Sequence, residues 1–175
     1  EGPSDARRLV DIARQLARHG REEARATIWE LRARALDQGG LVPALEELLP
    51  LATAGTPTRI EIEAVGSSRR LPAEVEHHLL RIAQEAVTNA VKHSGASLVR
   101  VRFHVGEFEF KLSISDNGSG FNPDNRCVGE RSGFGLVGMR ERAARLHGTL
   151  DIQSRPGQGT TISIVGPVRQ AERDH

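Results

Sequence analysis

Apolar residues recur every three or four positions in the first forty residues, which is the spacing of an amphipathic helix. The pattern predicts one long helix over residues 4 to about 38, begun by a Ser4 or Asp5 cap and ended by Gly39 and Gly40. Its apolar stripe is narrow, and the other face is rich in Arg and Glu. Such a helix packs either on its own domain or in a helical bundle shared between subunits, and we favour the bundle.

The remaining chain alternates helical periodicity with the period-two pattern of strands. Strands are predicted at 59–65, 98–105, 108–115, 149–154 and 160–165. Helices are predicted at 41–54, 72–94 and 136–147. Gly106 and Glu107 are expected to form a two-residue turn between the second and third strands. Strands that are apolar on one side and charged on the other belong to a sheet with one solvated face, so we expect an α+β fold: a two-layer sandwich with its helices on one face of the sheet.

Composition narrows the possible functions. The 175 residues include 24 Lys plus Arg and 23 Asp plus Glu, a net charge of +1, which argues against nucleic acid as a partner. No apolar stretch approaches the ~20 residues that cross a bilayer, so we expect no membrane contact from this segment. The single Cys127 excludes an internal disulfide. Because the chain begins at Glu1 without Met, we expect it to be part of a longer protein.

One predicted helix carries polar side chains beside its apolar stripe. Glu85, Asn89 and His93 are four residues apart, and Lys92 is adjacent to His93. A carboxylate, an amide oxygen and cationic donors in one row could hold a hard metal ion together with the phosphates that it carries. Taken alone, the same row also fits an ordinary solvated helix face.

Two glycine-rich segments follow. Residues 116–121 come directly after a strand, and glycine there permits positive φ and close backbone approach to a ligand, although a plain turn fits equally well. Residues 133–139 open a helix, whose free N–H groups favour an anion. No strand runs directly into the second segment, which argues against a dinucleotide-binding βαβ unit.

The order and spacing of these segments closely resemble the ATP-binding domain of the GHKL superfamily, also called the Bergerat fold. Residues 84–93 (QEAVTNAVKH) resemble its N box, 116–120 (DNGSG) its first glycine box, 133–139 (GFGLVGM) its second, and 157–161 (GQGTT) its closing Gly-x-Gly-Thr element. Residues 135–142 (GLVGMRER) are similar to sensor histidine kinases of the nitrate-sensor and desaturase-sensor type. Residues 24–32 (ARATIWELR) resemble the second helix of that family's dimerisation and phosphotransfer hairpin.

The resemblance implies a domain plan. Residues 1–40 would be the second helix of a partial hairpin, 41–57 a linker helix, 58–168 the ATP-binding catalytic domain and 169–175 a frayed tail. It also implies the Bergerat fold and a protein-histidine kinase that uses ATP and Mg²⁺. Its expected partners are a second copy, bound through the N-terminal helix, and a response regulator. The domain would be cytoplasmic, and a membrane anchor elsewhere in the protein is left open.

The resemblance assigns roles to single residues. Asn89 would coordinate Mg²⁺ bridging the ATP phosphates, and Glu85 would polarise the attacking nucleophile or support the metal's waters. Lys92 and His93 would contact phosphate. Asp116 would accept a hydrogen bond from the adenine amino group, a role that suits a carboxylate otherwise costly to bury.

Further positions are implied around the base and the phosphates. Gly118 and Gly120 would let the backbone pass close to the base, and either Thr160 or Thr161 would share a water or hydroxyl bond with Asp116. Residues 121–132 would form a mobile lid. The other implied nucleotide contacts are Phe121, Gly133, Phe134, Gly135, Leu136, Gly138 and Met139.

The chain departs from the family in one respect. The family's phosphoacceptor histidine is followed by an acidic residue, and no such pair occurs before the N box; His19 is followed by Gly20. We therefore expect ATP binding without self-phosphorylation. The alternatives are an ATPase of the chaperone or repair type and a non-catalytic dimerisation module; intact Asn89 and Asp116 argue against the latter. A metal site from His77, His78 and Cys127 is disfavoured, because adjacent helical residues point to different sides.

Overall fold

The computed structural model describes residues 36–66, 69–122 and 134–168, all within the compact unit formed by residues 35–175. Nearly all of the predicted N-terminal helix lies outside these residues; 36–39 are helical. The expected lid beyond Asn122, Cys127, Gly133 and the tail 169–175 also lie outside them. The dimerisation helix and the lid therefore remain predictions.

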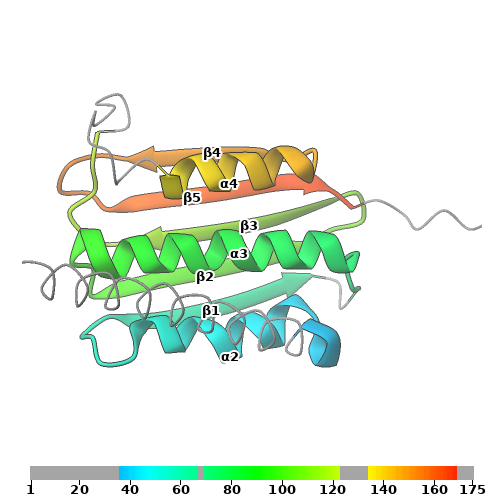
Figure 1. Cartoon of the computed structure of the whole chain (residues 1–175), viewed down its shortest axis with the longest axis horizontal. Helices are drawn as coiled ribbons and strands as arrows, with labels where there is room; N and C mark the ends of the chain where they lie inside the picture. Colours follow the sequence, from blue (N-terminus) through cyan, green and yellow to red (C-terminus); the bar gives the residue numbers. More distant parts are fainter. Residues whose placement is uncertain (1–35, 67–68, 123–133, 169–175) are drawn as a thin grey trace, which may run out of the picture. The chain divides into compact units, whose positions relative to one another are not determined.

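The described unit is built on a five-stranded mixed sheet (Figure 1). Its strands are β1 (Arg59–Gly66), β2 (Leu98–Val105), β3 (Glu109–Asp116), β4 (Thr149–Ser154) and β5 (Thr160–Pro167). Their order is β1-β2-β3-β5-β4, with β1 and β2 parallel and the other pairs antiparallel. All five predicted strands are present.

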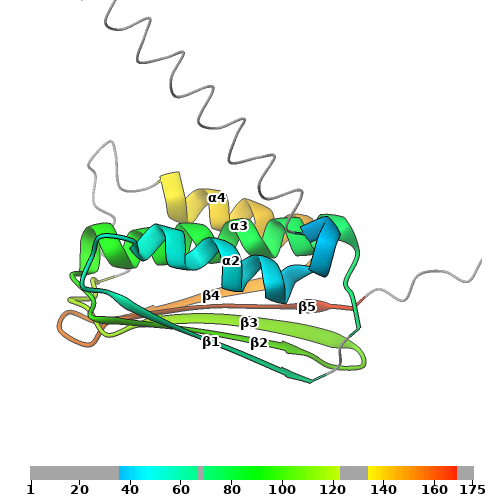
Figure 2. The same ribbon diagram turned by 90° about the horizontal axis from the view of Figure 1, so that it is seen from below.

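The helices lie together on one face of this sheet (Figure 2). They are α2 (Leu41–Thr53), α3 (Ala73–Asn89) with its π-helical continuation η1 (Ala90–Ser94), and α4 (Phe134–Arg145). α3 covers the centre of the sheet and runs beside α2 and α4. The expected α+β fold, a two-layer sandwich with helices on one face, is confirmed.

Strand periodicity decides which sheet face is buried. Along β2, Val99, Val101, Phe103 and Val105 are buried beneath the helices, whereas the residues between them are exposed. On that exposed face β1 and β2 pair opposite charges, with Glu61 to Arg100 at 2.9 Å and Glu63 to Arg102 at 3.0 Å. Exposed pairs of this kind contribute little to stability, so the apolar layer between sheet and helices holds the unit together.

The buried carboxylate of Glu76, at the start of α3, pairs with Arg70, and Arg70 also bonds the segment before α2. Glu76 is 2% exposed and accepts hydrogen bonds from Arg70 Nε (3.2 Å), Arg70 Nη2 (3.0 Å) and the Leu71 N–H (3.2 Å). Arg70 Nη2 also donates to Leu36 O at 2.8 Å and packs over Gly40, whose φ is +87°. A side chain at Gly40 would displace Arg70, so glycine there lets the chain turn sharply into α2.

Two local predictions were wrong. The turn between β2 and β3 is centred one residue later than expected: Gly106 N–H donates to Glu109 O at 2.8 Å, which places Glu107 and Phe108 in the turn. Phe108 is 70% exposed. The reason is the register, which pairs buried Val105 with buried Phe110 and leaves no place for Phe108 in the strand.

The second difference concerns the helix predicted over 72–94. Its α-helical part ends at Asn89, and residues 90–94 widen into a π-helical turn that ends at Gly95 with φ +61°. The four-residue spacing from Asn89 to His93 therefore does not place the two side chains in one α-helical row. Single π-helical turns of this kind are frequent at functional sites.

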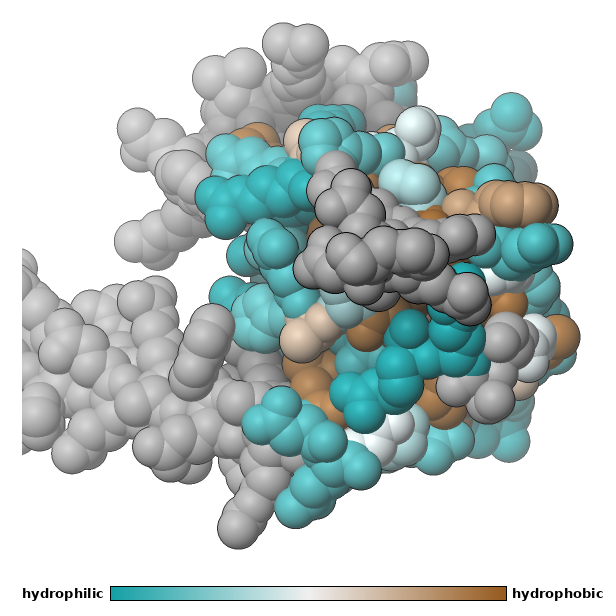
Figure 3. All heavy atoms as spheres, turned by 90° about the vertical axis from the view of Figure 1, so that its right-hand side faces the viewer, coloured by the Kyte–Doolittle hydropathy of each residue, from teal (hydrophilic) through white to brown (hydrophobic). Residues whose placement is uncertain are grey.

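One face of the described residues carries a mixture of hydrophilic and apolar side chains. Seen from the end where α3 begins and β2 turns into β3, hydrophilic side chains are interspersed with small apolar areas (Figure 3). Exposed apolar side chains such as Leu51 and Val65 are ordinary at a protein surface. No helix in the described ranges is long and apolar enough to cross a membrane.

Candidate functional site

The end of α3, the start of α4, the end of β3 and the start of β5 lie at the same end of the described unit (Figure 1). This is where the sequence placed most of its candidate residues. The contacts fall into two groups, one between α3 and α4 and one between β3 and β5. Together they bring side chains more than seventy residues apart in sequence to one end of the fold.

Glu85 and Asn89 of α3 meet α4 at Gly135. A Cβ built on Gly135 would collide with Glu85 Oε1 and would lie 3.5 Å from Asn89 Nδ2. Glu85 and Asn89 are one helical turn apart and both are half-buried, so they present a carboxylate and an amide side by side. Glycine at 135 is therefore what lets these two polar groups approach the first turn of α4.

Lys92 and His93 lie on η1, one turn beyond Asn89, and both are exposed. The π-helical turn rotates them away from the row that α-helical spacing would give. Among the described residues, no hydrogen bond or ion pair brings either side chain to Glu85.

Asp116 ends β3 with its side chain half-buried. Its Oδ1 accepts a hydrogen bond from the Gly118 N–H at 2.8 Å, which begins the turn after the strand. The register pairs Asp116 with Thr160 and Ser115 with Thr161. Because side chains alternate across a sheet, Thr160 shares the helix-covered face with Asp116, whereas Thr161 lies on the opposite face.

The hydroxyl of Thr160 belongs to a small network centred on Ser154. Ser154 Oγ accepts from the Phe121 N–H at 2.8 Å, contacts Gly159 O at 3.0 Å and lies 2.9 Å from Thr160 Oγ1. Since Ser154 has one hydroxyl hydrogen and the Gly159 carbonyl can only accept, the hydrogen between the two hydroxyls comes from Thr160. This leaves the Thr160 oxygen as an acceptor toward the site.

The glycines after Asp116 let three loops pack closely. A side chain on Gly118 would collide with Ser94, whose carbonyl accepts the Ser119 N–H at 2.8 Å. Gly120 has φ +57° and lies against the Arg155 carbonyl, and Gly159 has φ +73° and lies against the Asp116 carbonyl. Other parts of the protein occupy the space beside these glycines. The glycines therefore allow the loops to pack tightly around Asp116.

Sequence reasoning missed three framework residues, namely Ser94, Asn117 and Ser154. Asn117 Oδ1 accepts from the N–H groups of Ser97 and Leu98, both at 3.0 Å, and its Nδ2 donates to Ser97 Oγ at 2.9 Å. It thereby ties the end of β3 to the start of β2. An Asn next to Gly after a strand often bonds to nearby backbone, a signal that could have identified it.

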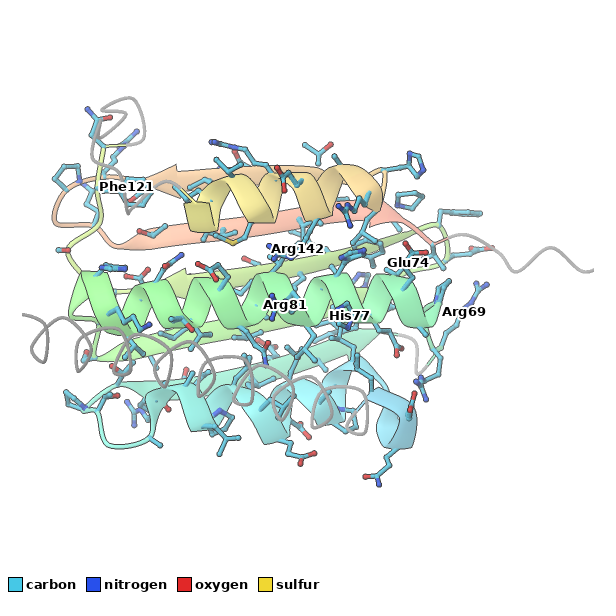
Figure 4. All side chains as sticks on the ribbon, in the orientation of Figure 1. Arg69, Glu74, His77, Arg81, Phe121 and Arg142 are labelled. Atoms are coloured by element: carbon cyan, nitrogen blue, oxygen red, sulfur yellow. The ribbon has the colours of Figure 1, made fainter. Side chains whose placement is uncertain are left out.

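The remaining candidates lie at different depths. Met139 is fully buried in the core, and Leu136 is half-buried against it. Gly138 lies under the side chain of Arg142. Phe121 is 37% exposed at the site end of the molecule (Figure 4). Gly133 and the side chain of Phe134 lie outside what the structure describes.

Comparison with known proteins identifies the family. Residues 74–170, more than half of the chain, match the family described as histidine kinase-, DNA gyrase B-, and HSP90-like ATPase. The signal transduction histidine-protein kinase/phosphatase DegS of Brevibacillus brevis is 36% identical over 172 residues, covering 98% of this chain and 44% of its own. The sensor histidine kinase LiaS of Bacillus subtilis is 33% identical over 164 residues, covering 94% and 44%.

A solved structure shares the fold. The Erythrobacter litoralis EL346 blue-light activated histidine kinase superposes with a TM-score of 0.68 at 20% identity, over 89% of this chain and 51% of its own. The chain spans less than half the length of the curated relatives named above. The resemblance inferred from residues 84–93, 116–120 and 133–139 is confirmed: the chain belongs to the histidine kinase-, DNA gyrase B-, and HSP90-like ATPase family.

Proposed function

We propose that this chain binds ATP with Mg²⁺ and donates the γ-phosphoryl group to a histidine that it does not itself carry. The observation that carries the proposal is the meeting of Glu85 and Asn89 with Gly135, where α3 reaches the start of α4. The printed names of the relatives, histidine-protein kinase/phosphatase and sensor histidine kinase, support the same reaction.

The donor set fits Mg²⁺. Asn89 offers the ion an amide oxygen, and the Glu85 carboxylate one turn away remains available to the acceptor imidazole; both side chains are half-buried. The described residues contain no cluster of three or more His, Cys, Asp or Glu that could enclose a metal ion. Mg²⁺ keeps several waters and usually binds through one or two protein ligands plus the phosphates of the substrate. A single protein oxygen ligand such as Asn89 is compatible with this mode of binding. The ion would neutralise charge on the phosphates that it bridges.

Asp116 is the residue that we propose to bind the amino group of adenine. One carboxylate oxygen holds the turn at Gly118, and the described residues provide no hydrogen-bond donor to the other. A half-buried carboxylate oxygen without a donor is suited to the amino group of adenine. Of the two threonines weighed from the sequence, Thr160 is the one that we propose to support this site, because it shares the face of Asp116.

In the proposed transfer, the bond from the γ-phosphorus to the bridging oxygen breaks, ADP leaves, and a phosphorus–nitrogen bond forms on the acceptor imidazole. Glu85 orients that imidazole and takes its proton. Lys92 and His93, exposed beside Asn89, would contact phosphate oxygens. The protein's main contribution is then positioning and charge neutralisation rather than covalent chemistry.

The partners follow from the same proposal. The acceptor histidine would lie on a dimerisation hairpin whose second helix is residues 1–40, and a response regulator would receive the phosphoryl group. Residues 41–57 would be the linker and 58–168 the catalytic domain.

A phosphotransfer assay tests the proposal. The chain is incubated with radiolabelled ATP, Mg²⁺ and an isolated phosphoacceptor hairpin from a related sensor kinase. We expect label on the hairpin that is lost in acid and kept in alkali, as a phosphorus–nitrogen bond requires, and none with Asn89→Ala. Release of free phosphate from ATP without hairpin labelling would contradict the kinase proposal and favour an ATPase of the chaperone or repair type.

A further inference from the structure

One basic side chain at the interface between α3 and α4 is not explained by the contacts described so far. Gly135, Gly138, Met139 and Arg142 are three or four residues apart, so they share the face of α4 that packs toward α3. Figure 4 shows Arg142 in the strip between the two helices. It is half-buried, although it is only one turn from the end of the helix.

The guanidinium of Arg142 reaches back toward the start of α4. A Cβ built on Gly138 would lie 2.8 Å from Arg142 Nη1, so this glycine lets the side chain fold over the preceding turn. Gly135, one turn earlier, is the residue that Glu85 contacts. Positions three apart on a helix face are roughly 5–6 Å apart, which places the Arg142 guanidinium within roughly 10 Å of the Glu85 carboxylate on the same interface.

Arg142 has no anionic partner in the described ranges. Three guanidinium groups in these ranges form ion pairs with carboxylates: Arg70 with Glu76, Arg100 with Glu61 and Arg102 with Glu63. Arg142 forms neither an ion pair nor a hydrogen bond with a described residue. A half-buried guanidinium without a counter-charge has given up part of its hydration without gaining a charged partner.

A structural role at the end of α4 does not account for this geometry. Basic residues in the last turn of a helix stabilise it when their charge lies near the last carbonyl groups. The Arg142 guanidinium is instead directed to Gly138, a full turn toward the N-terminus. Arg145, in the same last turn, is placed for the dipole interaction.

We propose that Arg142 binds the terminal phosphate of ATP and so makes the site discriminate between ATP and ADP. This inference rests on the proposed function and specifies which side chain completes the phosphate end of the site. Its planar fork can bind two phosphate oxygens, and it would also neutralise charge on the γ-phosphoryl group as that group leaves ADP.

Calorimetric titration with two nucleotides tests this assignment. The non-hydrolysable β,γ-imido analogue of ATP and ADP, each with Mg²⁺, are titrated into wild type, Arg142→Gln, Arg142→Lys and Arg140→Gln. Arg140 is on the same helix but exposed, so it is the matched control. We expect Arg142→Gln to weaken the triphosphate analogue about tenfold or more and ADP less than twofold, because a charge-assisted hydrogen bond to phosphate is lost. Arg142→Lys should recover part of the loss, and Arg140→Gln should match wild type.

The possible results distinguish failure of the Arg142 assignment from failure of the proposed ATP binding. Equal weakening of both nucleotides by Arg142→Gln, or no weakening, would overturn the role of Arg142 and leave nucleotide binding intact. Equal loss together with a lowered melting temperature would show that Arg142 only supports α4. A folded wild-type chain that binds neither nucleotide would overturn both proposals.

Discussion

His78 lies in the first turns of α3 and is half-buried. Its Nδ1 is buried and has no hydrogen-bond partner in the described ranges, and its Nε2 is 3.9 Å from Glu74 Oε1. Burial lowers the pKa of His78; the Glu74 carboxylate opposes this shift, and the Arg145 and Arg142 guanidinium groups add to it. The lowered pKa favours the neutral form of the ring at pH 7.

This histidine should make stability depend on pH. Because its folded-state pKa is below the ordinary value of about 6.5, the unfolded chain binds the proton more readily. The stabilising contribution is complete above the unfolded-state pKa and is lost as the pH falls through it toward the folded-state pKa. We expect the free energy of unfolding, measured by urea titration, to fall between pH 7 and pH 5 more steeply in wild type than in His78→Gln. Parallel pH profiles would contradict this assignment.

At the scale of elements, the loop between β4 and β5 packs against the end of β3 at Asp116. Gly157 and Gly159 both have positive φ, +78° and +73°. A Cβ on Gly157 would meet nothing within 4 Å, whereas one on Gly159 would collide with the Asp116 carbonyl. The two positions therefore have the same backbone conformation and differ in their surroundings.

This pair gives a matched test of how the loop frames Asp116. Gly157→Ala should lower the free energy of unfolding by about 1 kcal/mol, the usual cost of a left-handed conformation for a residue with a Cβ. Gly159→Ala should cost at least about 2 kcal/mol more, because the β3 end must shift away. Chemical denaturation of the two variants measures the difference; equal losses would mean that the loop moves freely and does not hold Asp116.

At the scale of the whole molecule, the fold follows from alternation that is plain in the sequence. In β2 every second residue is apolar, and in α3 every third or fourth residue is apolar. Both sets of side chains are buried in the single layer between the sheet and the helices. The Phe108 turn and the π-helical end of α3 were not predictable in this way. Strand pairing fixes the first, and a one-residue change in helical hydrogen bonding fixes the second.

Part of the candidate site could be proposed from the sequence, and the roles of its residues remain predictions. The motif order identified Glu85, Asn89 and Asp116, but which threonine faces Asp116 depends on the register of β5 against β3, a contact between segments more than forty residues apart. Buried Glu76 was also missed, because its partner Arg70 lies six residues away with no regular spacing. Side chains whose role comes from tertiary contacts leave no periodic signal.

The central claim is that Asn89 and Asp116 belong to one Mg·ATP site, and it can be measured directly. Titration of the β,γ-imido analogue of ATP into the chain, with and without Mg²⁺, should show binding by wild type that strengthens with Mg²⁺. Asp116→Asn should weaken binding about tenfold to a hundredfold, since a hydrogen bond to a charged group contributes about 1.5–3 kcal/mol, with little change in melting temperature. Asn89→Ala should abolish the Mg²⁺ dependence. Binding that both variants retain unchanged would contradict the account.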